Sequence, residues 1–232
     1  MKFFLGLMVG VFVAILIGVA AITVAFGSID DINFSDDDDS AKISKTYELT
    51  DFDRIDIAGV YDLDVSVGGA FSVEISGPED EMARVYARVE GGELILDQTK
   101  RENGKRNWRK RGLDARITLP ALSAISVSGV VDGGVVGVAA EQFRVDLSGV
   151  GDLDLSGECG DLTANVSGVG DLNAEELKCK NVDVDVSGVG EASVYASESV
   201  DASISGIGEI EVYGSPPTVE KSGGFLSRID VK

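Results

Sequence analysis

The sequence contains no histidine and only two cysteines. Without histidine, the catalytic Ser-His-Asp triad and the Cys-His pair of thiol enzymes are both excluded. Two cysteines alone also cannot supply the ligand sets of ordinary zinc sites. The Gly-x-Gly pairs recur at regular intervals, and none has the context of a Walker or dinucleotide-binding motif. These absences argue against an enzyme, and no cofactor is expected apart from the calcium discussed below.

Basic residues are scarce as well. Forty Asp and Glu against twenty Lys and Arg give a net charge of −20. The electrostatic field of so negative a protein repels phosphates over most of the surface, so a nucleic acid is not expected as a partner. The exception is Lys100–Arg116, where eight bases accompany two acids.

Two interpretations of this basic stretch stay open. It is either a solvated loop whose charges offset acidic neighbours, or a contact for an anionic glycan, a lipid headgroup or an envelope protein. In the second case arginines would donate paired hydrogen bonds and the tryptophan would offer a stacking face. The candidate residues are Arg106, Trp108, Arg109 and Lys110.

Glycine, with 29 residues, is what the chain has in abundance, and it is ordered in a repeat. The unit Ser-Gly-apolar-Gly-acid begins at Ser148, Ser167, Ser187 and Ser205, with a degenerate copy at Ser128. The steps between these serines are 20, 19, 20 and 18 residues. A period of this length is typical of a solenoid, in which each unit packs only against its neighbours.

Around each serine, apolar and polar residues alternate. Before Ser148 stand Phe143, Val145 and Leu147, and after it Leu153 and Leu155, with apolar equivalents in the other copies. Alternation at period two predicts strands with one buried face, here two short strands per repeat joined by glycine turns. Equivalent strands in successive coils must pair in parallel, and parallel crossovers are right-handed. The predicted fold class is all-β, a right-handed parallel β-helix with about 20 residues per coil and a narrow two-sheet cross-section.

The region before the repeats shows the same alternation with fewer glycines, and Glu79–Arg88 fits either a helical turn or a loop. The motif Phe52–Gly59 (FDRIDIAG), the step Ile117–Leu122 (ITLPAL) and the Ser-Gly turns that follow resemble the bacterial GIN-domain family. That family is labelled an auto-transporter adhesin head domain, and the resemblance covers roughly residues 48–230. It implies an exported right-handed β-helix and brings no catalytic residues, while the basic insertion departs from the family pattern.

The amino terminus predicts export. Residues 3–27 form an uncharged stretch that is longer than a signal-peptide core and long enough for a membrane span. Residues 1–27 are therefore interpreted as a transmembrane anchor or a signal peptide, with cleavage after Ala25-Phe26-Gly27 left open. Lys2 precedes this segment and acidic residues follow it, which orients the rest of the chain outside the cytoplasm. Residues 28–45 read as an acidic flexible linker and residues 46–232 as one GIN-like β-helix domain. The expected location is extracytoplasmic, in the bacterial envelope, with the chain anchored in the inner membrane.

The acids that end the repeat should stack along one edge, about 4.8 Å apart. The weak calcium candidates are Asp152, Asp171, Glu191 and Glu209. Calcium favours carboxylate oxygens, but acids that cap solvated turns explain the column equally well.

The two cysteines, Cys159 and Cys179, are one coil apart, in a column whose other members are the small residues Ala140 and Ser197. Stacked residues at this spacing are within reach of a disulfide, and two free thiols are the alternative.

Taken together, these patterns predict a non-enzymatic, exported β-solenoid that serves as a binding or adhesion module of the cell envelope. Two alternatives stay open: an enzyme acting on polysaccharide through aspartates or an arginine, and a purely structural envelope component. An active site would interrupt the repeat at one coil, whereas the acids here recur in columns.

Overall fold

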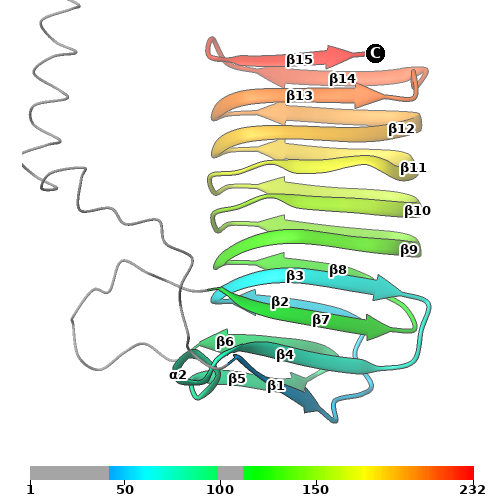
Figure 1. The fold of residues 1–232 in the computed structure, drawn as a ribbon. Coiled ribbons are helices and arrows are strands. Elements are labelled where there is room, and N and C mark those ends of the chain that lie inside the picture. Colours follow the sequence, from blue (N-terminus) through cyan, green and yellow to red (C-terminus); the bar gives the residue numbers. More distant parts are fainter. Residues whose placement is uncertain (1–41, 99–111) are drawn as a thin grey trace, which may run out of the picture. The chain divides into compact units, whose positions relative to one another are not determined.

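The structure is a computed structural model that describes residues 42–98 and 112–232, and these residues form an all-β solenoid of about five turns (Figure 1). The predicted N-terminal hydrophobic helix and the candidates Arg106, Trp108, Arg109 and Lys110 lie outside the described residues. The predicted flexible linker, residues 28–45, lies outside them up to residue 41, whereas residues 42–45 belong to a strand that is paired with its neighbour. Within the two described ranges, no helix has the length and apolar character needed to cross a membrane.

The elements follow one another with short connections. In chain order they are β1 (Lys42–Tyr47), β2 (Arg54–Ala58), β3 (Val60–Val67), β4 (Ser72–Pro78), the short helix α2 (Glu79–Met82), β5 (Val85–Glu90), β6 (Glu93–Gln98), β7 (Leu113–Leu119), β8 (Ala124–Val127), β9 (Val130–Leu147), β10 (Leu153–Val166), β11 (Leu172–Val186), β12 (Val189–Ile204), β13 (Ile207–Tyr213), β14 (Thr218–Gly223) and β15 (Ser227–Val231).

The repeats form the body of the solenoid. Strands β9, β10, β11 and β12 pair in parallel, each with the next, and β12 pairs with both β13 and β14. The expectation of two short strands per repeat is wrong in one respect. Each coil is a single strand of 14 to 18 residues, because backbone pairing continues through the second bend. In β10 that bend is absorbed by a register shift next to Gly157, whose φ is +135°.

The core lies where the alternation predicted it. All five columns of inward residues are at most 3% exposed: Phe143, Leu162, Val182 and Val200; Val145, Ala164, Val184 and Ala202; Leu147, Val166, Val186 and Ile204; Leu153, Leu172, Ala192 and Ile210; Leu155, Ala174, Val194 and Val212. Because each residue stacks on its equivalent one coil away, the same small set of apolar side chains fills every layer.

The N-terminal end departs from the expected all-parallel pairing. Strands β2 and β3 form a coil that pairs in parallel with β8 and β9, while β1 with β4, β4 with β7 and β5 with β6 pair antiparallel. Gly91 and Gly92, at φ +57° and +82°, make the two-residue turn that joins β5 to β6. Two consecutive positive φ values favour a tight hairpin, which forces antiparallel pairing there. Strands β6 and β7 still pair in parallel with β2 and β3, and the antiparallel strands β1, β4 and β5 cap this end.

In the C-terminal coil, a lysine stands at the register position that apolar residues occupy in the coils before it. Lys221 of β14 pairs with Ala202, a fully buried residue, so it occupies an inward column. Its Nζ donates a hydrogen bond to the carbonyl of Ile229 in β15, 3.2 Å away. A charge at an inward position is a recognised device against further strand pairing, and it closes this end of the solenoid.

Candidate interaction surfaces

The two cysteines are joined by a disulfide between neighbouring coils. Cys159 of β10 and Cys179 of β11 are paired in register, with their Cα atoms 4.5 Å apart. Their column continues to Ala140 on one side and to Ala196 on the other, rather than to Ser197. The register of β11 against β12 shifts just after Cys179, which moves the column by one residue. Ser197 instead donates a hydrogen bond from its hydroxyl to the Cys179 carbonyl, at 3.3 Å.

The repeat acids form the expected column, and two of their carboxylates accept hydrogen bonds from the backbone of the next coil. Asp152 Oδ1 accepts a hydrogen bond from the Asp171 amide at 3.1 Å, and Asp171 Oδ1 accepts one from the Glu191 amide at 2.9 Å. Glu209 lies 3.6 Å from the Arg228 guanidinium. Each of these carboxylates therefore caps or pairs with the next coil. In the part of the chain that the structure describes, no three Asp, Glu or Cys side chains are grouped to hold a metal ion.

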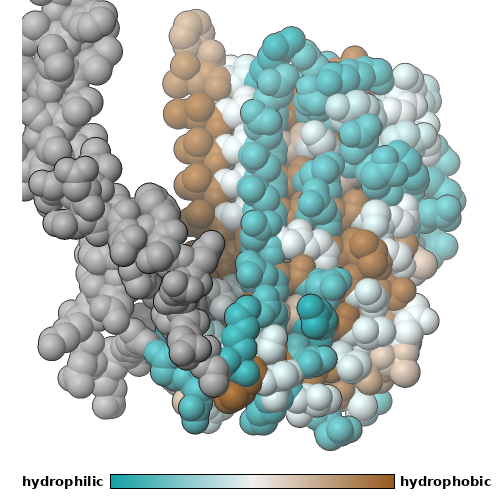
Figure 2. All heavy atoms as spheres, viewed as in Figure 1, coloured by the Kyte–Doolittle hydropathy of each residue, from teal (hydrophilic) through white to brown (hydrophobic). Residues whose placement is uncertain are grey.

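Beside the acids runs a line of exposed apolar side chains, which we call the apolar ridge. Its members are the residues between the two repeat glycines, and each contacts its equivalent through a β-bridge or strand pair. They are Val130, Val150, Val169, Val189 and Ile207, which are 42%, 50%, 54%, 49% and 52% exposed. Figure 2 shows the ridge as a brown line parallel to a teal line of hydrophilic residues, with a pale line between them.

The turn between β14 and β15 extends the ridge by one coil. Ser227 pairs with Gly208, so Leu226 stands next in line after Ile207. Leu226 is 62% exposed, and its neighbour Phe225 is fully exposed. The ridge therefore reaches the C-terminal end of the solenoid and finishes there in a bulkier apolar group.

Sequence reasoning missed the ridge, although the signal was present. Inward residues stand at odd offsets from the repeat serine, for example Leu147 one before Ser148 and Leu153 five after it. Val150 stands two positions after Ser148, and even offsets of this kind belong to the outward-facing, solvated positions. Val150 was assigned to none of the inward columns, yet an apolar residue at a solvated position in every repeat marks an exposed apolar line.

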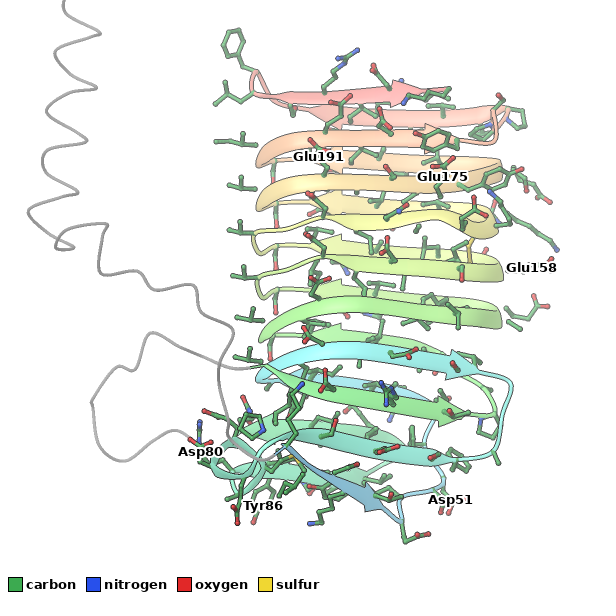
Figure 3. All side chains as sticks on the ribbon, in the orientation of Figure 1. Asp51, Asp80, Tyr86, Glu158, Glu175 and Glu191 are labelled. Carbon is green, nitrogen blue, oxygen red and sulfur yellow. A yellow bond between two sulfur atoms is a disulfide. The ribbon has the colours of Figure 1, made fainter. Side chains whose placement is uncertain are left out.

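The opposite bend of the coils carries two tyrosines. Tyr195 and Tyr213 are register partners on β12 and β13. Lys178 places its Nζ 4.2 Å from the Tyr195 ring centroid, and Lys232 places its Nζ 5.1 Å from that of Tyr213. Figure 3 shows Glu158 at this side, away from the turn corner that carries the ridge. Each ring thus already holds a cation against one face, where a ligand would otherwise stack.

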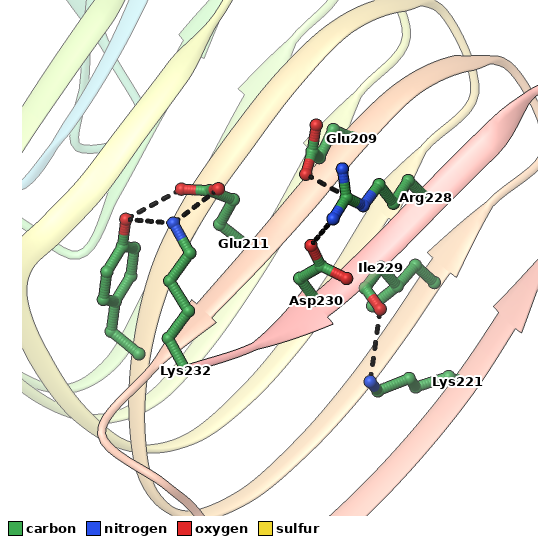
Figure 4. Close-up of polar contacts among 8 residues, drawn as sticks. Glu209, Glu211, Lys221, Arg228, Ile229, Asp230 and Lys232 are labelled. Atoms are coloured by element: carbon green, nitrogen blue, oxygen red, sulfur yellow. Dashed lines mark hydrogen bonds and ion pairs between the residues drawn. The ribbon is translucent and has the colours of Figure 1, made fainter.

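A polar cluster fastens the last coil (Figure 4). Glu211 accepts hydrogen bonds from the Lys232 Nζ at 2.6 Å and from the Tyr213 hydroxyl at 2.7 Å. These bonds, that of Lys232 first, lower the pKa of Glu211, and the bond to Glu211 raises the pKa of Lys232. Arg228 lies 2.7 Å from Asp230 on the same strand. All these partners belong to β13, β15 and the residue after β15, so the cluster joins the final strand to the coil below it.

A shallow hollow of about 300 Å³ lies where β3, β7 and β9 meet. Its polar lining consists of Asp62, Asp64, Asp114, Asp132 and Arg116. Asp62 and Asp132 are register partners, so the hollow continues the acidic column to the base of the solenoid. It is a surface feature of the scaffold.

Comparison with known proteins identifies the fold's relatives. Residues 51–216 match the model of a family described as "Putative auto-transporter adhesin, head GIN domain". The crystal structure of a putative adhesin from Bacteroides fragilis is similar, with a TM-score of 0.70 and 27% sequence identity over 83% of this chain and 97% of that one. A putative adhesin from Parabacteroides distasonis shares the fold, with a TM-score of 0.50 and 17% identity over 83% of this chain and 98% of that one. No curated protein matches the chain.

Proposed function

The chain belongs to the head GIN-domain family, and from this membership we propose that it is a non-enzymatic adhesion module exported to the bacterial cell envelope. The observation that carries the proposal is the likeness to the adhesin of Bacteroides fragilis, which spans nearly the whole of that protein at 27% identity. In this proposal the solenoid is a right-handed parallel β-helix whose stacked coils hold an extended outer surface in a fixed shape.

The disulfide supports export. Cys159 and Cys179 are the only cysteines of the chain, and they are bonded to each other. Disulfides form and persist in oxidising compartments and are rare in the cytosol. The uncharged residues 3–27 then serve as the tether to the inner membrane, with the acidic segment after them as a spacer.

The repeated structural role of the column acids supports a binding role over a catalytic one. Asp152 and Asp171 each accept a hydrogen bond from the backbone of the following coil, which is a structural task repeated along the column. A general acid or base would instead face a substrate at a single position. The column thus maintains the turns and leaves recognition to other surfaces.

The partner in this proposal is an anionic glycan, a lipid headgroup or an envelope protein that the basic stretch contacts. The rest of the surface is strongly acidic, so the eight bases between Lys100 and Arg116 are the residues suited to an anionic ligand. Arginine supplies bidentate hydrogen bonds to carboxylate or sulfate groups, and Trp108 supplies a stacking face.

The test is binding of cells that display the full chain to immobilised anionic glycans and to envelope extracts. We expect replacement of Arg106, Trp108 and Arg109 by alanine to reduce binding at least about tenfold, since charge-assisted bonds and stacking are both removed. Lys180→Ala, an exposed lysine on β11, is the matched control and should bind as the parent does. Unchanged binding by the triple variant rules out the basic stretch as the contact. Shortening of the glycan by the parent protein contradicts the non-enzymatic assignment.

A further inference from the structure

We propose that the apolar ridge is the contact between two copies of this chain, which lie side by side and point in the same direction. The ridge as defined above, with Leu226 and Phe225 at its end, forms one straight line along the solenoid. No other described part of the chain covers it. The proposal goes beyond adhesion to an outside ligand, because it concerns how two copies of the chain associate.

The size of the ridge marks it as an interaction surface. Its line from Val130 to Leu226 takes five steps of about 4.8 Å, or roughly 24 Å. With the exposed Phe225, the apolar surface is on the order of 600 Å², the upper end of what a monomer exposes without a partner. A stable interface needs roughly 800 Å² on each side, which the glycine and serine columns flanking the ridge can complete.

A second copy fits the ridge better than any other surface of known geometry. A partner must present a straight apolar edge whose side chains repeat at the spacing of the ridge residues. The ridge of a second copy has this spacing because it is the same surface. Two identical lines of apolar side chains can pack against each other over their whole length, each residue at the level of its equivalent, as in dry interfaces between stacked sheets. A two-fold axis then gives a closed dimer in which the same patch serves both copies.

The acidic column decides the direction of the partner. In each repeat the acidic residue stands two positions after the ridge residue, so the acidic column runs beside the ridge on one side only (Figure 2). A two-fold axis parallel to the ridge places the two columns on opposite sides of the contact. An axis across the ridge would place both columns on the same side, with carboxylates facing carboxylates. Like charges opposed in this way disfavour the second arrangement, so the parallel one is selected.

Parallel pairing also brings like ends together. Phe225 of each copy lies at the same level, next to its equivalent, and extends the contact at the C-terminal end. The Lys42 ends of the two solenoids then lie together at the other end. This arrangement agrees with two chains tethered to one membrane. The membrane tether rests on the proposed function, whereas the contact between the two ridges does not depend on it.

Disulfide trapping in the full chain tests the proposal. The native cysteines are bonded to each other, so a new cysteine is the only free thiol. In a parallel pair each ridge residue meets its own equivalent, so Val150→Cys and Ile207→Cys should each give a covalent dimer by themselves. Val136→Cys is the matched control, because Val136 is 52% exposed and lies off the ridge on β9. We expect each ridge variant to give at least tenfold more dimer than this control.

Each other outcome overturns the proposal. Dimers that form only when Val150→Cys and Ile207→Cys chains are expressed together indicate antiparallel pairing. Trapping no greater than in the Val136→Cys control means that the ridge does not join two copies, and lipid or another protein covers it.

A second measurement guards against cysteine-specific effects. Val169→Asp combined with Val189→Asp places unpaired charges in the contact and should convert the detergent-solubilised protein to a monomer by native mass spectrometry, with its β-sheet circular dichroism retained. Val136→Asp should leave the dimer intact. A parent protein that is monomeric in this experiment contradicts the proposal directly.

Discussion

Gly168 lies directly against the backbone of Gly149, one coil earlier. A Cβ added to Gly168 would stand 1.9 Å from the Gly149 carbonyl oxygen. The same contact recurs one coil later, where a Cβ on Gly188 would stand 2.0 Å from the Gly168 oxygen. The first glycine of each repeat is thus required by the close approach of two coils, and a hydrogen bond from Val169 to the Gly149 carbonyl runs beside it.

We expect Gly168→Ala to destabilise the protein by about 3 kcal/mol, because the added methyl group meets rigid backbone that cannot move without separating two coils. The measurement is chemical denaturation of the detergent-solubilised chain. Gly224→Ala is the control, since nothing lies within 4 Å of a Cβ at that position. Equal stability of the two variants would contradict the close packing of the turns.

The role of the glycines was only partly predictable from the sequence. Both repeat glycines were expected to form turns because glycine can take positive φ, but Gly149 and Gly168 do not lie in that region. Of the second glycines, Gly151 and Gly170 do, at φ +132° and +148°, whereas Gly190 and Gly208 do not. A sequence shows that glycine is required, but it does not show whether dihedral freedom or a close neighbour requires it, because the neighbour belongs to another coil.

Removal of the disulfide by Cys159→Ala and Cys179→Ala should cost about 3 kcal/mol of unfolding free energy, since the bond closes a loop of 20 residues in the unfolded chain. The variant should keep the fold, because both positions stack on alanines and tolerate a small side chain. Thermal melting with and without reductant checks this value. A parent protein whose midpoint is unmoved by reductant, while free thiols are detected, would refute it.

Calcium should leave the melting midpoint unchanged. Asp152 and Asp171 already use a carboxylate oxygen to accept a backbone hydrogen bond, so the column does not present a free set of ligands. Melting with excess calcium and with a chelator tests this. A midpoint that rises with calcium concentration, as ligand linkage requires, would restore the calcium hypothesis for Asp152, Asp171, Glu191 and Glu209.

The pH dependence of the final strand should follow Glu211. Its pKa lies below the ordinary value of 4.5 because Lys232 and Tyr213 donate hydrogen bonds to it. The folded state therefore gains stability from this carboxylate above that value and loses it as the pH falls through the lowered pKa. Hydrogen exchange of β15 should show fraying of the parent once the pH falls below this lowered pKa, relative to neutral pH.

Glu211→Gln is the comparison for this measurement. The substitution removes the charge at every pH, so β15 should already be frayed at neutral pH. The difference in hydrogen-exchange protection of β15 between the variant and the parent should disappear in acid. A constant difference between the two proteins across the pH range would show that Glu211 does not titrate in contact with Lys232.

Lys221→Val should promote end-to-end association. The change removes the charge from an inward position on the last coil and leaves an apolar strand end, which is a template for pairing with another chain. Sedimentation should show mass that increases with concentration beyond that of a dimer for this variant only. Lys180→Val, on the outer side of β11, is the control, and association of both variants would attribute the effect to charge alone.

Most of the body of the fold followed from the sequence, whereas its ends did not. The inward columns at Val145 and Leu153 repeat identically, so one register satisfies all coils. The cap depends on single features such as the Gly91-Gly92 turn, which no repeat reinforces. The apolar ridge fell between these cases, because it is periodic like the core yet lies outside it.

The position of the disulfide has a mechanical consequence. In the proposed adhesive role, a pulling force would load the solenoid between the proposed membrane tether and the bound surface, and coils would peel from the ends one at a time. Cys159 and Cys179 hold two middle coils together, and the chain between them, a sequence separation of 20, forms a covalent loop. At about 3.4 Å per residue, roughly 70 Å of chain is therefore withheld from extension however far the outer coils unravel. The bond sets a maximum length to which this protein can be stretched.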